Sequence, residues 1–209
     1  MSFEIVKPED IERRSFELIE AELPHPLPEE LAPIIKRVIH TTADFDYADS
    51  LYFSEGVLEK ALLALSGGAT IVTDTNMACA GINKGALKKL GGRAVCFMAD
   101  EDVAEAAKQN GTTRAVASMD KAAGLEGPVI FAIGNAPTAL IRLDELMKKR
   151  RLCPALIVGV PVGFVNVVAS KELICESGAP CIVARGRKGG SNVAASVINA
   201  LMYLLTRSA

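Results

Sequence analysis

The stretch VIFAIGNAPTALIRLDELMKKRRLCPALIVGV, residues 129–160, contains two short apolar runs separated by a longer segment with helical spacing. Residues 129–133 and 155–160 have the length and composition of buried strands, and residues 136–149 place apolar side chains at helical intervals. A strand, a helix and a second strand in this order form the unit that joins neighbouring parallel strands. Because both runs are apolar at nearly every position, we expect helices to cover both faces of the sheet.

The same alternation continues on both sides of this stretch, from about residue 55 to the C-terminus. Strands are predicted over residues 70–73, 94–98, 115–117, 129–133, 155–160 and 181–184. Helices are predicted over residues 55–65, 83–90, 102–110, 136–149, 166–176 and 193–205. The predicted fold class is therefore α/β: a three-layer α/β/α sandwich with a mostly parallel sheet of five to six strands.

Two amphipathic helices are predicted before this region, over residues 8–22 and 29–40. The prolines of LPHPLP, residues 23–28, separate them, because proline lacks a backbone donor and restricts the backbone. A length of 209 residues favours one domain. We therefore expect a single domain over residues 1–209, in which an N-terminal helical segment, residues 1–54, precedes the sandwich of residues 55–209.

Charge and composition exclude several classes of protein. The 23 Lys and Arg residues nearly balance the 25 Asp and Glu residues, the formal charge is -2, and no basic run indicates nucleic-acid binding. No apolar run approaches the roughly 20 residues of a membrane-spanning helix. The N-terminal sequence MSFEIVKPEDIERR is charged where a signal peptide is apolar. We expect a cytoplasmic protein with neither a membrane partner nor a nucleic-acid partner.

The cysteines and histidines predict neither a disulfide scaffold nor a metal centre. The five cysteines lack CxxC spacing and mostly stand in apolar runs, so we interpret them as reduced core residues. The two histidines, His25 and His40, are well separated, and the sequence spacing provides no zinc ligand set.

Four loops that follow predicted strands are rich in Gly, Asn, Thr and Pro: TDTNMACAGI, GNAPTAL, GVPVGFVN and ARGRKGGSN. Ligands of open parallel sheets bind beyond the carboxyl ends of the strands, so a site is expected among these loops. The glycines of GRKGGSN, residues 186–192, allow backbone N–H groups to approach a carboxylate or phosphate at a helix N-terminus. Neither GxxxxGK[ST] nor GxGxxG occurs after a strand, which disfavours nucleotide binding. A glycine turn with solvated basic residues is the alternative interpretation.

His40 stands at the end of the second predicted helix and begins the sequence HTTADFDY. Histidine exchanges a proton near neutral pH, and a helix C-terminus favours its charged form. These properties make His40 a candidate general acid. A single histidine is nevertheless more often structural, and we interpret His25, between prolines, as an exposed loop residue.

Six segments follow one another along nearly the whole chain: ERRSF (12–16), RVIHTTADFDY (37–47), DTNM (74–77), GNAPTAL (134–140), GVPVGFVNV (159–167) and GRKGGSN (186–192). Together they resemble one family, the precorrin-8X methylmutases, or precorrin isomerases, of cobalamin biosynthesis. The resemblance implies an isomerase that moves the methyl group at C-11 of the macrocycle to C-12. The implied product is hydrogenobyrinic acid from precorrin-8X, or cobyrinic acid when cobalt is already present.

The resemblance also implies roles for residues: His40 as proton donor, and Ser15 and Arg37 as substrate contacts. Arg37 precedes His40 by three residues, so both lie on one helix face, where the guanidinium can hold a carboxylate while the imidazole addresses the ring. Further candidates for substrate binding are Thr41, Thr42, Arg114, Asn135, Arg187, Gly189, Gly190 and Ser191. Both threonines, and Asn135 before its helix, can equally be capping residues. The chain departs from many relatives at Ala169, where they have Glu.

An isomerisation needs no redox cofactor and no ATP, so no cofactor is expected. The resemblance implies a homodimer with sites near the subunit boundary, and a transient handover of the tetrapyrrole product to the next corrinoid enzyme. The predicted helix over residues 193–205 is apolar around most of its circumference, which suits either the core or a subunit interface.

Two rival functions stay open. One is a non-catalytic corrinoid-binding carrier, which would bind product without turnover. The other is an α/β enzyme that uses a phosphate-bearing cofactor at GRKGGSN, which tight nucleotide binding would reveal.

Overall fold

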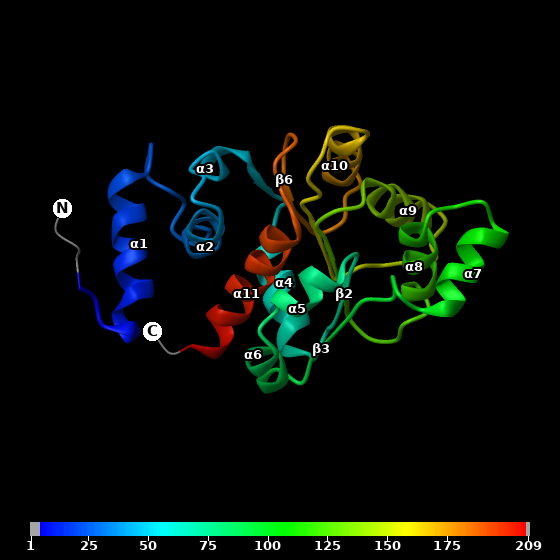
Figure 1. Cartoon of the computed structure of the whole chain (residues 1–209), viewed down its shortest axis with the longest axis horizontal. Coiled ribbons are helices and arrows are strands. Elements are labelled where there is room, and N and C mark those ends of the chain that lie inside the picture. The colour runs from blue at the N-terminus through cyan, green and yellow to red at the C-terminus, as the bar shows by residue number, and fades with distance from the viewer. Residues whose placement is uncertain (1–4, 208–209) are drawn as a thin grey trace.

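A six-stranded sheet runs through the centre of the computed structural model, which describes residues 5–207 (Figure 1). The strands are β1 (Leu51–Phe53), β2 (Thr70–Thr73), β3 (Arg93–Val95), β4 (Val129–Ile133), β5 (Leu156–Gly159) and β6 (Cys181–Ala184). Their order across the sheet is β1-β6-β5-β4-β2-β3. Strand β1 runs antiparallel to β6, and the other neighbouring pairs are parallel, which confirms the mostly parallel sheet.

Helices cover both faces of this sheet. They are the 3-10 helix η1 (Pro8–Asp10) and the α-helices α1 (Ile11–Glu22), α2 (Ala32–Thr42), α3 (Tyr47–Ser50), α4 (Val57–Ser66), α5 (Asn76–Gly81), α6 (Lys84–Lys89), α7 (Glu101–Gln109), α8 (Arg114–Ala122), α9 (Pro137–Lys148), α10 (Val167–Glu176) and α11 (Ser191–Thr206). One face packs against α4, α5, α6 and α11, with α2 on α11 and α1 outside α2 (Figure 1). The other face packs against α8, α9 and α10, and α7 packs on α8.

Alternate residues of the same strand contribute to the two cores. In β4, Ile130 and Ala132 belong to the core that contains α11, whereas Phe131 and Ile133 belong to the core that contains α9, and all four are fully buried. Helix α11 buries most of its apolar side chains in the core, whereas Leu204 and Leu205 near its end are exposed. The predicted α/β/α sandwich is confirmed.

The prediction of a strand over residues 115–117 is wrong, because these residues lie in α8. The Thr113 hydroxyl accepts the N–H of Val116 and caps the helix. Ala115, Met119 and Ala122 are then buried at helical spacing. A run of three apolar residues is too short for periodicity to distinguish a strand from a helix.

The N-terminal segment is not wholly helical, because β1 forms its end. Leu51 pairs with Ala184 and Phe53 with Ile182, so this segment provides the antiparallel edge strand. Three residues give no periodic signal in the sequence. Helices α3 and α5 were not predicted either; the remaining elements lie within three residues of their predicted ends.

The structure tests two expectations from the sequence, the absence of a membrane-spanning helix and the burial of the cysteines. Across residues 5–207, no helix combines the length and apolar character needed to cross a membrane. The five cysteines are free thiols, but Cys181 alone is buried and Cys153 is exposed. The interpretation of the cysteines as core residues is therefore correct for Cys181 and wrong for Cys153, because apolar neighbours in sequence do not determine burial.

The strand order places a topological switch point between β2 and β4. From β2 the chain leads to β3 on one side, whereas β4, β5 and β6 follow one another on the other side. In open parallel sheets, ligands bind in the crevice at such a point, outside the carboxyl ends of the strands.

Candidate active site

A carboxylate occupies the crevice between β2 and β4. Asp74, the residue after β2, is 1% exposed and accepts the backbone N–H groups of Gly134 (2.9 Å), Asn135 (2.8 Å) and Ala136 (2.6 Å). Burial raises the pKa of Asp74, against the opposing effect of the three N–H donors. Asp74 thus fixes the turn before α9.

The N-terminus of α11 packs against the same turn. The hydroxyl oxygens of Thr75 and Ser191 are hydrogen-bonded at 2.7 Å. A Cβ added at Gly134 would lie 2.7 Å from the Cα of Ser191, so this close approach of two backbones requires glycine. The loops after β2, β4 and β6 therefore meet at one edge of the sheet.

The glycine-rich loop after β6 lies directly on the end of β5. Gly189 has a φ of 155°, and a Cβ there would lie 2.1 Å from the carbonyl oxygen of Val160. Gly190 donates its N–H to the same oxygen at 2.9 Å. The glycines of this loop thus allow a tight contact with a neighbouring backbone, and the N–H of Gly190 is already used.

Lys188 connects this loop to the end of α2. Its ammonium lies 2.6 Å from a carboxylate oxygen of Asp44 and 2.5 Å from one of Asp46. The two carboxylates raise the pKa of Lys188, and the lysine lowers the pKa of Asp44. The glycine-rich loop and the segment that follows His40 are therefore held side by side.

His40 lies on the surface in the last turn of α2. Its ring centroid is 5.4 Å from that of Phe16 on α1, and the imidazole makes no hydrogen bond to another residue in the described range. The helix ends at Thr42, because Ala43 adopts a left-handed conformation and donates its N–H to Ile39. Both ring nitrogens are thus available to exchange a proton with a bound ligand.

Arg37 lies one turn before His40, as the spacing predicts, but it already holds a carboxylate. Its guanidinium bonds an oxygen of Glu12 at 2.6 Å and lies over the rings of Phe16 (4.7 Å) and Tyr203 (5.2 Å). The side chain of Arg37 is 14% exposed. The hydrogen bond from Arg37, opposed by burial and helped by Arg207, lowers the pKa of Glu12 to about 2. Arg37 thus ties α1 to α2 and α11.

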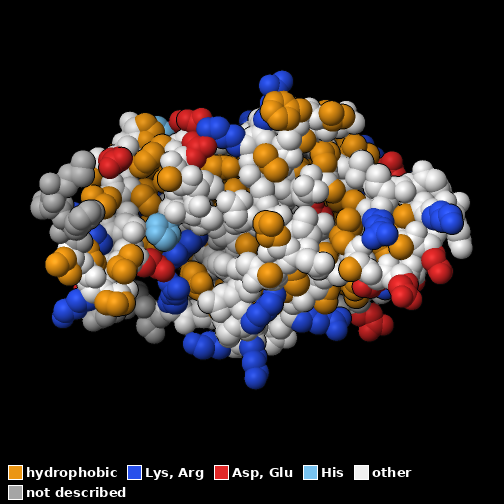
Figure 2. Space-filling model, viewed as in Figure 1, with side chains coloured by type: hydrophobic (Ala, Val, Ile, Leu, Met, Phe, Trp, Pro, Cys, Tyr) orange, Lys and Arg blue, Asp and Glu red, His pale blue; other side chains and the backbone are white. Residues whose placement is uncertain are grey.

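A groove of about 280 Å³ runs beside these residues. Its lining residues are Arg37, Thr41, Gly81, Asn192, Ala195, Ser196, Asn199 and Tyr203. Helix α2 contributes two of these residues, the end of α5 contributes Gly81, and α11 contributes the others. Helix α6 adds the exposed Lys84, Lys88 and Lys89, and basic side chains gather around it at the lower edge of Figure 2.

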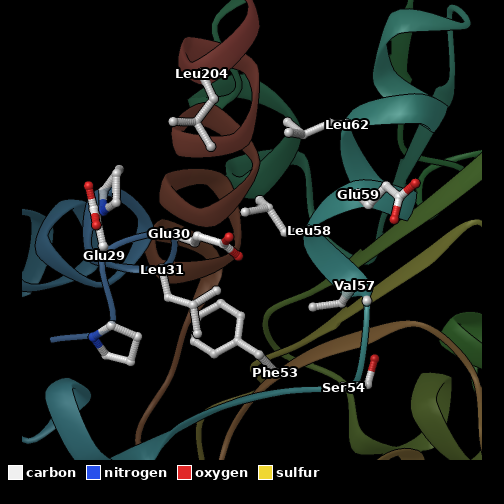
Figure 3. A pocket seen from close by; sticks show the side chains of 13 residues that line it. Glu29, Glu30, Leu31, Phe53, Ser54, Val57, Leu58, Glu59, Leu62 and Leu204 are labelled. Carbon is white, nitrogen blue, oxygen red and sulfur yellow. The ribbon is translucent and has the colours of Figure 1, made fainter.

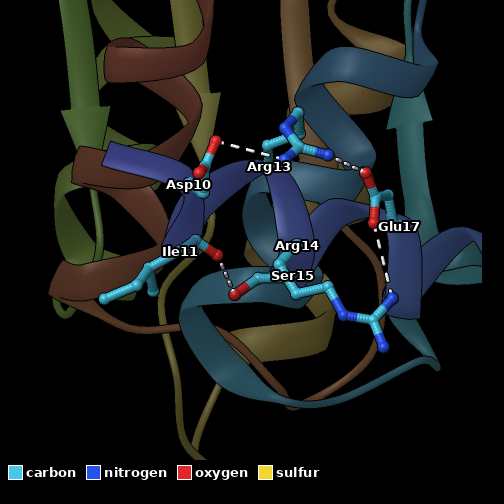
Figure 4. A network of polar contacts seen from close by, with 6 residues as sticks. All are labelled: Asp10, Ile11, Arg13, Arg14, Ser15 and Glu17. Atoms are coloured by element: carbon cyan, nitrogen blue, oxygen red, sulfur yellow. Dashed lines mark hydrogen bonds and ion pairs between the residues drawn. The ribbon is translucent and has the colours of Figure 1, made fainter. Parts of the chain in front are cut away.

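Three predicted binding residues turn their hydroxyl groups toward their own helices. Thr41, Thr42 and Ser15 each donate to the carbonyl oxygen four residues earlier, at 2.9, 2.9 and 2.8 Å (Figure 4 for Ser15). The Thr42 oxygen also accepts the N–H of Asp44, so this side chain shapes the end of α2. The oxygens of Ser15 and Thr41 can still accept a hydrogen bond from a ligand.

The other predicted residues spread along the carboxyl edge of the sheet. Arg187 is exposed, and its guanidinium lies 5.4 Å from the ring centroid of Phe164. The Asn135 side chain is also exposed. Arg114 is exposed at the start of α8, on the sheet face opposite to α2. Arg37 and Thr41 thus line one groove, and Lys188 links the glycine-rich loop to the end of α2, whereas Arg114 lies on the opposite face of the sheet.

A larger cavity, of about 1280 Å³, lies at the opposite ends of α2 and α11 (Figure 3). Its apolar wall includes Leu58, Leu62 and Leu204. Three glutamates also line it: Glu29, Glu30 and Glu59. These carboxylates repel an anionic ligand, and the lining contains none of the predicted site residues.

Two buried charged residues that hold the site together, Asp74 and Lys171, were not predicted from the sequence. Lys171, on α10, is fully buried and donates to the carbonyl oxygens of Gly186 (2.9 Å) and Lys188 (2.8 Å). An acid directly after a predicted strand was an available signal for Asp74. Lys171 stands between Ser170 and Glu172, so the sequence gives no comparable signal for its burial.

Comparisons with known proteins agree on one family. The sequence pattern described as precorrin-8X methylmutase matches residues 10–204. The cobalt-precorrin-8 methylmutase of Priestia megaterium is 44% identical over 200 residues, which cover 95% of this chain and 89% of that protein. The protein of the same name from Salmonella typhimurium is 46% identical over 208 residues, covering 96% and 97%.

A solved structure gives the same result. The precorrin-8X methylmutase of Thermus thermophilus matches with a TM-score of 0.84 and 37% identity, covering 93% of this chain and 96% of that one. The named relatives are methylmutases, which are isomerases. The resemblance seen in the six sequence segments is confirmed, and the chain belongs to the precorrin-8X methylmutase family.

Proposed function

We propose that this chain moves a methyl group from C-11 to C-12 of precorrin-8X or cobalt-precorrin-8. The product is hydrogenobyrinic acid, or cobyrinic acid when cobalt is present. In this 1,5-sigmatropic shift the bond from the methyl carbon to C-11 breaks as the bond to C-12 forms, so no electron is gained or lost. Protonation of the macrocycle prepares its conjugated system for the shift, and the proton is returned afterwards.

The observation that supports this mechanism best is the state of His40. Its imidazole is exposed beside the groove, next to Arg37 and Thr41, and no described residue holds either ring nitrogen. A general acid needs this access to the atom that it protonates. We propose that His40 donates the proton and takes it back.

The acetate and propionate arms of the macrocycle are the second element of the proposal. We place them against Arg187 and against the backbone N–H groups of Ser191 and its neighbours at the start of α11. Ser15 and Thr41 accept hydrogen bonds beside His40, and Asn135 and Arg114 lie further along the edge. Gly189 and Gly190 contribute through the close backbone approach that they permit. Thr42 shapes the end of α2.

We further propose that the chain acts as a homodimer that transfers its product directly to the next corrinoid enzyme. A groove of about 280 Å³ is smaller than the pockets of about 300–1,000 Å³ that enclose drug-sized ligands, so a second surface is needed to bury a tetrapyrrole. Phe164 and Val165, 80% and 79% exposed, extend from the loop after β5 and can supply that contact. A cytoplasmic location fits the five free cysteines.

The test of the proposed reaction follows the migrating carbon. Precorrin-8X labelled with ¹³C in the C-11 methyl group is incubated with the pure protein, and the product is analysed by carbon NMR. We expect the labelled methyl signal to move to the C-12 position, with one labelled methyl per product molecule. A label that stays on C-11 while the substrate is bound would reject the isomerase and support the carrier.

A further inference from the structure

The buried lysine of α10 holds the glycine-rich loop from inside the protein. Lys171 is 0% exposed, and its ammonium donates to the carbonyl oxygens of Gly186 and Lys188 at 2.9 and 2.8 Å. No carboxylate within the described range forms an ion pair with it. Burial lowers the pKa of Lys171 to about 8, so the side chain is still mostly protonated at neutral pH. A buried charge whose bonded partners are loop carbonyls fixes the orientation of those carbonyls.

The orientation of these two carbonyl groups also sets the direction of the N–H groups in the same peptide groups. The carbonyl of Gly186 and the N–H of Arg187 belong to one peptide group, and so do the carbonyl of Lys188 and the N–H of Gly189. The described peptide bonds are trans, so each N–H points away from its carbonyl and therefore away from Lys171. Neither N–H donates to another described residue. Two unused donors in the loop at the carboxyl edge of the sheet thus point away from Lys171.

Further contacts keep this loop in a single position. Gly163 donates its N–H to the carbonyl oxygen of Arg187 at 3.1 Å, and Gly190 donates to Val160 at 2.9 Å. The Lys188 ammonium binds the two carboxylates that follow the His40 helix. Two unused donors two residues apart, in a loop that is fixed on several sides, are able to bind an anion.

We propose that Lys171 is a positioning residue for substrate binding: its buried ammonium orients the 186–187 and 188–189 peptide groups so that the N–H groups of Arg187 and Gly189 bind a carboxylate arm of the tetrapyrrole. This inference rests on the proposed function. Lys171 does not touch the substrate, and the methyl transfer proceeds without it once the substrate is bound.

The first test separates binding from chemistry. Lys171→Met keeps an unbranched apolar side chain, one atom shorter than lysine, and removes the ammonium. We expect KM for cobalt-precorrin-8 to rise about 10- to 100-fold, the loss typical of hydrogen bonds to a charged group, and kcat to stay within about threefold. Leu143→Ala, a cavity variant in the core around α9, is the control for a loss of stability alone and should keep the KM of the wild type. Equal KM values in the wild type and Lys171→Met would overturn the proposal.

A second measurement on the wild-type protein covers the case in which Lys171→Met fails to fold. Hydrogenobyrinic acid, which contains no metal, is added to ¹⁵N-labelled protein, and the backbone amide signals are followed by NMR. We expect the amide protons of Arg187 and Gly189 to move downfield as they bind a carboxylate. Saturating binding with both signals unmoved would reject the inference and leave the proposed function intact. A wild-type protein that neither binds nor converts the tetrapyrrole would reject both.

Discussion

Arg37 is held by a carboxylate of its own chain, and this bears on its role toward the substrate. Its guanidinium bonds Glu12 and stacks between two aromatic rings, although one of its faces lines the groove beside His40. The residue therefore has a structural role. Binding a substrate carboxylate requires either its unused donors or the release of Glu12.

Two variants separate these roles. We expect Arg37→Ala to weaken product binding and to lower kcat/KM by about 10- to 100-fold, because a charge-assisted hydrogen bond to a carboxylate is lost. Glu12→Gln removes the internal competitor and keeps the guanidinium, so it should bind product at least as tightly as the wild type. The measurement is a titration with hydrogenobyrinic acid followed by visible absorption. Equal losses of affinity in both variants would make Arg37 purely structural.

The turn that joins β4 to α9 depends on one buried carboxylate, that of Asp74 at the end of β2. Asp74→Asn leaves one carbonyl oxygen where two carboxylate oxygens accept three N–H groups. Each buried donor left without an acceptor costs about 1–3 kcal/mol, so we expect the free energy of unfolding to fall by at least that amount. Urea denaturation measures the loss, and Asp49→Asn, at an exposed position, is the control. An unchanged midpoint in Asp74→Asn would contradict the assigned role.

The contact between α1 and α2 should depend on pH through Glu12. Its folded-state pKa of about 2 lies below the ordinary value of 4.5, so the contact contributes its full stabilisation above about pH 4.5 and loses it as the pH falls toward 2. We therefore expect the wild type to be more stable than Glu12→Gln at pH 6, and the difference to shrink between pH 4.5 and 2. Urea denaturation of both proteins across this range measures it. A difference that does not change with pH would show that the Glu12 ion pair does not stabilise the fold.

The sequence predicted the elements whose own residues carry a sufficient signal. Strands such as β4 and β5 are continuous apolar runs, and helices such as α9 and α11 are long enough for periodicity. Strand β1 was missed because it exists through its pairing with β6, about 130 residues away in sequence. Residues 115–117 were misassigned because the Thr113 cap starts a helix that a short apolar run does not reveal.

Contacts between residues that are far apart in the sequence also limited the prediction of the site. His40 and Arg37 were predicted because their spacing within one helix is visible in the sequence. The contact of Asp74 with the turn after β4 joins residues about 60 positions apart, and the contact of Lys188 with Asp44 joins residues about 140 positions apart. The sequence spacing therefore revealed neither of these two contacts. The engagement of Arg37 by Glu12 likewise depends on how α1 packs on α2.

At the scale of the whole molecule, the exposed loop after β5 should decide the oligomeric state. Phe164→Ser removes a large apolar side chain that is 80% exposed, and we expect it to convert the proposed dimer into single chains with reduced turnover. Leu63→Ser, on α4 with 73% exposure, is the matched control and should leave the dimer intact. Size-exclusion chromatography with light scattering measures the mass. A wild type with the mass of one chain, 22.1 kDa, would contradict the proposed dimer directly.

The most direct test of the central claim is the visible absorption spectrum during incubation with precorrin-8X or cobalt-precorrin-8. Wild type, His40→Ala and the control His25→Ala are compared at catalytic protein concentration. We expect the wild type and His25→Ala to convert the substrate over many turnovers, and His40→Ala to bind it while losing about 10²- to 10⁴-fold in rate. A spectral change that saturates at one equivalent and is identical in all three proteins would contradict the account and identify a carrier.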